Sequence, residues 1–117
     1  MPVNMTSLGL ISFNNPATYQ FFIPDVVPDT AREFLLYASV ICGGTVRDLS
    51  ADIIFYVENG STRYEKFLHM YGWDQLAYNT NSDNMWFPMP SNRLVHMELP
   101  IAFPGSCWAQ LFTIGYR

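Results

Sequence analysis

Charged residues are scarce in this chain. Asp, Glu, Lys and Arg make up 14% of its 117 residues, and Lys66 is the only lysine. A typical soluble protein has about 25% charged residues, so uncharged polar side chains must carry most of the hydration here. The net charge is −4. Because no basic face is available to neutralise phosphates, we expect neither a nucleic-acid partner nor binding to an acidic lipid surface.

Long apolar runs are missing as well. The longest covers residues 34–42, whereas a membrane-spanning helix needs roughly 20 residues. We therefore expect no membrane span. The amino-terminal segment 1–6 has no basic segment followed by an apolar stretch, the pattern of a secretion signal. A cytosolic protein and a trimmed extracellular protein both stay open at this point.

The common catalytic motifs are also absent. His69 and His96 do not have zinc-protease spacing, and the chain has no nucleophile elbow, phosphate-cradling glycine loop or dinucleotide fingerprint. Nothing near Cys42 or Cys107 would activate a thiolate for a Cys–His pair. Asp74 and Asp83 are two carboxylates, but nothing around them indicates the buried acid that a glycosidase needs. We expect no enzyme.

What the chain does contain is a regular series of strand signals. Its length fits one domain, residues 1–117. Short β-branched and aromatic runs bounded by Gly, Pro, Asn or Asp predict an all-β, antiparallel, jelly-roll-like β-sandwich of about eight strands. The predicted strands are Leu8–Phe13, Tyr19–Ile23, Glu33–Ile41, Ala51–Glu58, Thr62–His69, Asn84–Phe87, Arg93–Leu99 and Cys107–Tyr116.

Three local patterns refine this prediction. Asn59-Gly60 favours a type I′ hairpin turn, which would pair its flanking strands antiparallel. Both faces of 33–41 and of 107–116 are largely apolar, so these strands should lie centrally in a sheet. A short helix over 28–37 is an alternative, because Thr30 and Glu33 have capping-box spacing, but the aromatic and β-branched run favours a strand.

Cys42 and Cys107 are the only two cysteines. They are disulfide candidates whose bridge would close a loop of about 65 residues, and two buried free thiols are the alternative. Asn4-Met5-Thr6 and Asn59-Gly60-Ser61 fit the N-glycosylation acceptor pattern. These features favour an extracellular protein only slightly.

The segment 71–86 has the most informative composition, because it mixes aromatic rings with amide and carboxylate oxygens. Sugars present hydroxyl groups that need hydrogen-bond partners and a C–H face that stacks on aromatic rings. We therefore predict a carbohydrate-binding loop there. The candidate ligand-binding residues are Asp74, Asn79, Asn81, Asp83, Asn84 and Trp86.

Two alternatives apply to this segment. Its carboxylate and amide oxygens are ligands that calcium accepts, although EF-hand spacing is missing. Otherwise its Asn and Asp residues only shape turns, and Trp73 and Trp86 cover the core. In addition, 19 aromatic residues exceed what one small core needs, and oligomer interfaces favour aromatic residues. A homo-oligomer would strengthen weak sugar binding through multivalency.

Four segments carry a family resemblance: Ile23-Pro24 through Val27–Tyr37, Asn81–Met89, Asn92-Arg93 and Ile114–Arg117. They resemble β-sandwich domains at the carboxyl ends of secreted, often collagen-like, invertebrate proteins. The last strand is also similar to the strand that closes H-type lectin domains, which are sugar-binding hexamers. The resemblance implies an extracellular, oligomeric recognition module with glycans or matrix glycoproteins as partners. The alternative is a structural or self-assembling matrix protein with no small ligand.

Overall fold

The protein is an all-β sandwich. A computed structural model describes residues 2–13, 17–43, 50–71, 79–100 and 106–117, with side chains for 5–12, 17–41, 52–70, 81–100 and 107–117. It contains eight strands and, over these residues, no helix. No helix in this part is therefore long and apolar enough to cross a membrane. The strands are β1 (Pro2–Phe13), β2 (Ala17–Phe22), β3 (Glu33–Gly43), β4 (Ser50–Asn59), β5 (Thr62–Tyr71), β6 (Asn79–Pro88), β7 (Leu94–Leu99) and β8 (Ser106–Tyr116).

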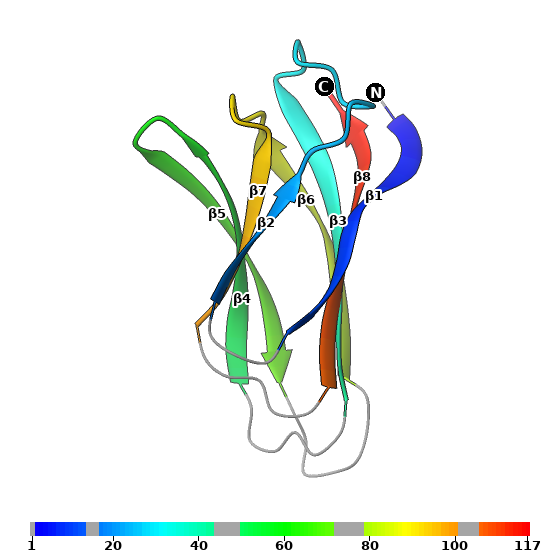
Figure 1. Cartoon of the computed structure of the whole chain (residues 1–117), viewed down its shortest axis with the longest axis vertical. Helices are drawn as coiled ribbons and strands as arrows, with labels where there is room; N and C mark the ends of the chain where they lie inside the picture. Colours follow the sequence, from blue (N-terminus) through cyan, green and yellow to red (C-terminus); the bar gives the residue numbers. More distant parts are fainter. Residues whose placement is uncertain (1, 14–16, 44–49, 72–78, 101–105) are drawn as a thin grey trace.

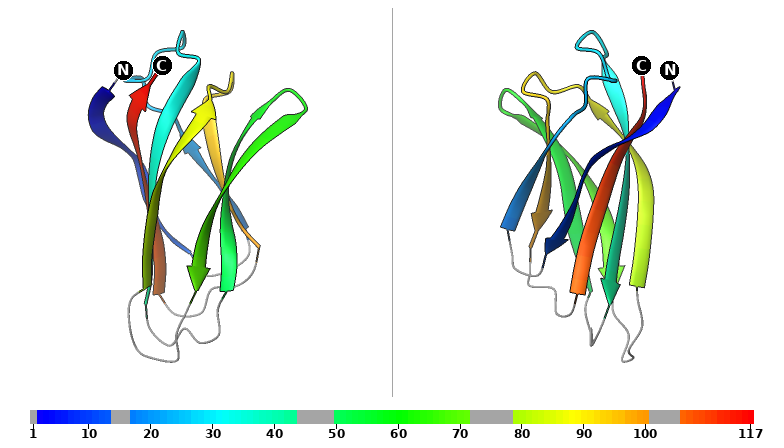
Figure 2. Two further views of the ribbon diagram at one scale, coloured as in Figure 1. Left: turned by 180° about the vertical axis from the view of Figure 1, so that it is seen from behind. Right: turned by 45° about the vertical axis from the view of Figure 1, so that its right-hand side comes forward.

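Two four-stranded antiparallel sheets face each other (Figure 1, Figure 2). We call the sheet with strand order β1-β8-β3-β6 sheet A, and the sheet with order β2-β7-β4-β5 sheet B. The hydrogen-bonded pairs β1–β8, β2–β7, β3–β6 and β4–β5 are those of a jelly roll. The predicted fold class is therefore confirmed.

The expected central position of two strands is also confirmed. β3 and β8 are the two inner strands of sheet A. Side chains along β3 alternate between buried and half-buried from Glu33 to Ile41, so one face packs on sheet B and the other lies on the outside of the molecule. The helical alternative for 28–37 is wrong, because a turn over 29–30 leads directly into β3 at Glu33.

The β4–β5 hairpin forms as predicted, but its turn is shifted by one residue. Asn59 pairs with Thr62 across the ladder, so Gly60 and Ser61 are the two central residues of the turn. Gly60 has φ 63°, whereas Ser61 is not among the positive-φ residues. Positive φ at the first central position alone is typical of a type II′ turn, since a type I′ turn has positive φ at both central positions.

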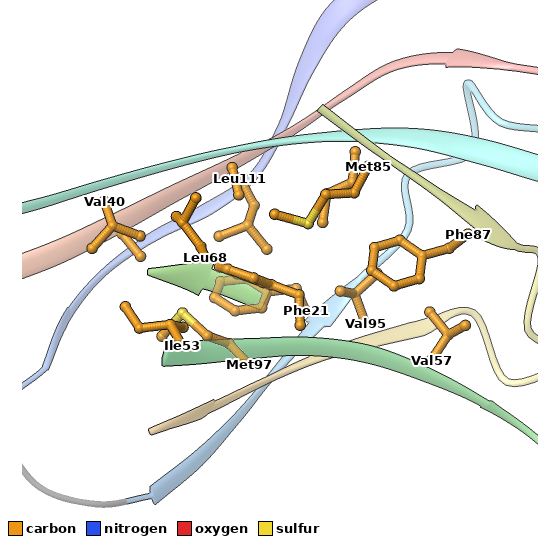
Figure 3. Close-up of a cluster of buried hydrophobic side chains, with 14 of the residues drawn as sticks. Phe21, Val40, Ile53, Val57, Leu68, Met85, Phe87, Val95, Met97 and Leu111 are labelled. Carbon is orange, nitrogen blue, oxygen red and sulfur yellow. The ribbon is translucent and has the colours of Figure 1, made fainter. Parts of the chain in front are cut away.

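The core is formed by the inner faces of both sheets. Figure 3 shows residues such as Leu111 and Met85 from sheet A opposite Ile53 and Met97 from sheet B. The rings of Phe34 and Phe87, on neighbouring strands β3 and β6, stack with their centroids 5.7 Å apart. Fully burying one such side chain contributes about 1.5–3 kcal/mol, so this interface provides most of the driving force for folding.

The two cysteines lie opposite each other in sheet A. Cys42 of β3 pairs in register with Cys107 of β8, and Cys107 is 1% exposed. The side chain of Cys42 lies outside the described residues, so the bridge stays a prediction. The position shows only that a bridge would join two adjacent strands of one sheet rather than the two sheets.

Candidate functional site

Part of the predicted binding loop is a strand. Residues 79–88 form β6, the edge strand of sheet A beside β3, whereas the sequence predicted a strand only from Asn84. Asp74 and the side chain of Asn79 lie outside the described residues. The prediction missed the start of β6 because Asn, Ser and Asp are depleted in strands, although an exposed edge strand accepts them.

The side chains of Asn81 and Asp83 form hydrogen bonds with backbone groups at the exposed edge of β6. The side-chain oxygen of Asn81 accepts a hydrogen bond from the backbone N–H of Ser82 at 2.9 Å, and that of Asp83 accepts one from Asn84 at 2.8 Å. The amide nitrogen of Asn81 also donates to the carbonyl of His69 on β5, at 2.9 Å. These contacts satisfy N–H groups at the edge of sheet A and tie it to sheet B.

Asn84 and Trp86 lie elsewhere, on the outer face of sheet A. In the ladder Asn84 is opposite Tyr37, and Trp86 is opposite Leu35. Met85, between them, is buried in the core. Because alternate residues of a strand point to opposite faces, Asn84 and Trp86 share the outward face with Tyr37 and Leu35. The structure therefore separates these two predicted residues from Asn81 and Asp83.

This outer face of sheet A combines aromatic rings with uncharged polar groups. Trp108 is opposite Ile41, and Phe112 is opposite Tyr37, with the Tyr37 and Phe112 ring centroids 6.2 Å apart. We call it the aromatic face. Between the rows of Leu35 and Ile41 its outward residues include no charged side chain: Ser7, Leu10, Ser12, Leu35, Tyr37, Ser39, Ile41, Ser82, Asn84, Trp86, Trp108, Gln110 and Phe112.

The rings on this face form a diagonal band. Trp108 lies in the row of Ile41, and Trp86 lies in the row of Leu35, six residues farther along β3. Tyr37 and Phe112 occupy a row between them. With about 3.4 Å per residue along a strand and about 4.8 Å between strands, the band is roughly 20 Å long. Each of its rings is half-buried, so part of each ring faces solvent.

An ion pair between Arg117 and Glu33 lies at the Trp86 end of the band. The guanidinium of Arg117 lies 4.1 Å from the centre of the Trp86 ring and pairs with Glu33 at 3.0 Å. A guanidinium at this distance from an indole ring makes a favourable cation–π contact. Because the two charges compensate each other, the aromatic face has no net charge even at this end.

The outer face of sheet B has a different chemistry. Tyr56 stacks on His96 with ring centroids 4.6 Å apart, and the guanidinium of Arg63 lies 3.6 Å from the centre of the Tyr56 ring. Arg63 also pairs with Glu65 and Glu98. Burial raises the pKa of the Tyr56 hydroxyl against the opposing effect of Arg63. The stability linked to the neutral phenol is thus present below pH about 10 and is lost as pH rises through the folded-state pKa.

The histidines do not form a catalytic arrangement in the described part of the chain. The exposed ring of His69 contacts Asp52, with Nδ1 2.9 Å from Oδ1. His96 is 7% exposed, and neither ring nitrogen has a hydrogen-bond partner within the described residues. The same residues include no group of three or more His, Cys, Asp or Glu side chains that could hold a metal ion. Calcium binding by the oxygen-rich residues of 74–84 stays a prediction.

The sequence argument missed Tyr37, Trp108 and Phe112 as site residues. It identified their strands as central and apolar on both faces, but it did not place these three rings on one surface. The signal that would have found them is alternation across neighbouring strands, which needs the register between β3, β6 and β8. That register comes from pairing between segments far apart in the sequence.

No protein family matches the chain, and no curated protein sequence matches it. The chemistry of the aromatic face is therefore what indicates a function.

Proposed function

We propose that this protein is a noncatalytic, lectin-like extracellular module that binds carbohydrate through the aromatic face. The observation that carries this proposal is the absence of charge over a broad sheet surface that holds Trp86, Trp108, Tyr37 and Phe112 together with amide and hydroxyl groups. The outer face of sheet B, with its ion pairs, does not share this chemistry.

The aromatic face matches the surface of a sugar ring. Half-exposed rings offer stacking area for C–H groups. Asn84, Gln110 and Ser39 add neutral donors and acceptors for hydroxyl groups. A neutral ligand loses less hydration energy on such a face than an ionised ligand, which would need paired charges.

The shape of the band favours a polysaccharide chain over a single sugar as the ligand. A band of roughly 20 Å on a sheet surface fits several consecutive sugar rings. A flat surface buries little of a small molecule, whereas small-molecule sites are usually concave. We therefore expect an extended polysaccharide or a long glycan as the ligand.

Two further observations support the extracellular and oligomeric parts of the proposal. Secreted, collagen-like proteins carry the β-sandwich domains that the sequence resembles, and jelly rolls occur in lectins. Several copies of the face in one oligomer would raise the avidity for a repeating polymer. Fold alone does not assign function, so the test must address the face.

The test is binding to polysaccharides and to a dense glycan array, with calcium and with a chelator. Trp108→Ala and Tyr37→Ala should each weaken binding by about two- to tenfold, because one aromatic contact is worth about 0.5–1.5 kcal/mol. Phe67→Ala is the matched control, since Phe67 is an aromatic residue of β5 that is 55% exposed. Equal losses for Phe67→Ala and Tyr37→Ala, or no binding to any glycan, would reject the proposal.

Self-assembly is the alternative function that the same face supports. A largely apolar, uncharged sheet surface can be covered by a second copy of the chain, and aromatic residues are enriched in such interfaces. Sedimentation of wild type and Tyr37→Ala separates the two functions. A defined oligomer that dissociates in Tyr37→Ala and binds no glycan would establish assembly as the role of the face.

A further inference from the structure

A pocket lies where three connections between strands meet. Its volume is about 470 Å³, and its lining comes from the β2–β3 connection, the β4–β5 turn and the β6–β7 connection. These three connections lie at the same end of the sandwich, the upper end in Figure 1. The lining residues are Asp29, Ala31, Asn59, Met89, Pro90, Ser91 and Arg93. The volume falls in the range of about 300–1,000 Å³ that is usual for small-molecule sites.

Arg93 organises the walls of this pocket. Its side chain is 13% exposed, and it donates hydrogen bonds to the carbonyls of Ile23, Pro24 and Val27 at 2.8–3.3 Å. It also pairs with Asp29 at 2.6 Å. Arg93 has φ 57°, a conformation that costs about 1–3 kcal/mol for a residue other than glycine. The strained backbone is held by these contacts, so the β2–β3 and β6–β7 connections form one rigid wall.

Asn59 connects the β4–β5 turn, which forms the third wall of the pocket, to the β6–β7 connection. Its amide group donates to the carbonyl of Met89 and accepts from the N–H of Ser91, both at 3.4 Å. These long contacts hold the end of β4 against the β6–β7 connection. They also occupy the acceptor side chain of Asn59-Gly60-Ser61, so a glycan attached there would have to replace them.

The residues that line the pocket offer no unpaired charge to an ionic ligand. Most donor groups of Arg93 are used by backbone carbonyls and by Asp29, so a phosphate or carboxylate finds no free cation. Asp29 is the only acid in the lining, and Arg93 already compensates its charge. An ammonium group or a divalent cation therefore gains little.

The lining does suit a small neutral polyol. Asp29 is 88% exposed, and one of its carboxylate oxygens is bonded to Arg93, which leaves the other oxygen to accept from a hydroxyl group. Asn59 and Ser91 add neutral donors and acceptors, and Met89 and Pro90 add an apolar wall. We propose that this pocket is a second ligand site, separate from the aromatic face, which binds a single neutral sugar ring through Asp29, Asn59 and Ser91.

A titration of ¹⁵N-labelled protein with free glucose, galactose, mannose and N-acetylglucosamine tests this site. Backbone amide signals of residues 29–31, 59–61, 89 and 91–93 should shift together and saturate for at least one sugar, at concentrations of about 1–10 mM. Asp29→Ala and Ser91→Ala should each weaken this binding by about fivefold or more, since each removes hydrogen bonds to the ligand. Asp25→Ala is the matched control, because Asp25 is an exposed acid of the same β2–β3 connection outside the lining.

The outcomes are decisive in both directions. Saturable shifts that are weakened in Ser91→Ala and unchanged in Asp25→Ala support the site. No shift with any of the four sugars at tens of millimolar, equal losses in Asp25→Ala and Asp29→Ala, or stronger binding of inorganic phosphate or methylammonium would overturn it. Tyr37→Ala should leave this titration unchanged, so failure of the pocket and failure of the aromatic face are separate results.

Discussion

At the scale of single residues, Arg93 shows how a side chain can organise backbone far away in the sequence. It lies near the start of β7, yet its hydrogen bonds go to carbonyls of residues 23–27, about 70 positions earlier. The sequence offered Arg93 only as the first residue of a predicted strand and as part of a family resemblance. The role of Arg93 depends on a buried guanidinium meeting several carbonyls, which no local pattern reveals.

We expect Arg93→Ala to lower the free energy of unfolding by about 2–4 kcal/mol, because it leaves several carbonyls without donors. Urea denaturation measures this loss. Arg93→Gly should be less harmful than Arg93→Ala, since glycine accepts the positive φ without strain. Arg32→Ala, at an exposed arginine of the β2–β3 connection, is the control and should change stability by less than about 0.5 kcal/mol. A loss in Arg32→Ala as large as that in Arg93→Ala would contradict this role.

At the scale of elements, β6 shows that a polar edge strand can be mistaken for a loop. Composition singled out 71–86 as a binding loop, but the Asn and Asp residues in its second half hid the strand that begins at Asn79. The side chains of four predicted site residues are described on this strand, and they fall into two pairs. Asn84 and Trp86 lie on the outer face of sheet A, whereas Asn81 and Asp83 accept hydrogen bonds from backbone N–H groups at the edge. The division follows from the period of two along a strand, once the strand is known.

We expect the double variant Asn81→Val, Asp83→Val to aggregate faster than wild type while it still binds polysaccharide. The substitutions remove the acceptors that cover the N–H groups of Ser82 and Asn84 and make the exposed edge apolar. Light scattering as a function of protein concentration measures the effect. Thr30→Val, at an exposed residue of the β2–β3 connection outside the strands, serves as control. If polysaccharide binding falls in the double variant as far as in Tyr37→Ala, Asn81 and Asp83 belong to the binding site after all.

At the scale of the whole molecule, the two outer faces of the jelly roll differ in charge and in aromatic content, whereas its two inner faces are alike. Both sheets contribute apolar inner faces to one core. Outside, sheet B carries the ion pairs of Arg63 and the contact of His69 with Asp52, and sheet A carries the aromatic face. Large exposed apolar patches often mark binding or assembly sites, and the proposed function rests on this difference between the two outer faces.

We expect a matched pair of phenylalanines to separate stability from function. Phe87 is fully buried in the core, and Phe87→Ala should cost about 3–5 kcal/mol of stability. Phe112 lies half-buried on the aromatic face, so Phe112→Ala should cost much less stability and should weaken polysaccharide binding. Thermal denaturation and binding assays check both. Equal destabilisation by the two variants would show that the aromatic face is part of the folding core.

The sequence by itself determined the class of fold, the approximate position of all eight strands, the central place of β3 and β8, and the low charge of the surface. These properties depend on side-chain alternation and turn residues, which are local. Only the tertiary structure decided that Trp86, Tyr37, Phe112 and Trp108 share one face, because strand register depends on pairing between distant segments. It also decided that Asp29, Asn59 and Ser91 line one pocket, since three separate connections meet there only after the two sheets have packed.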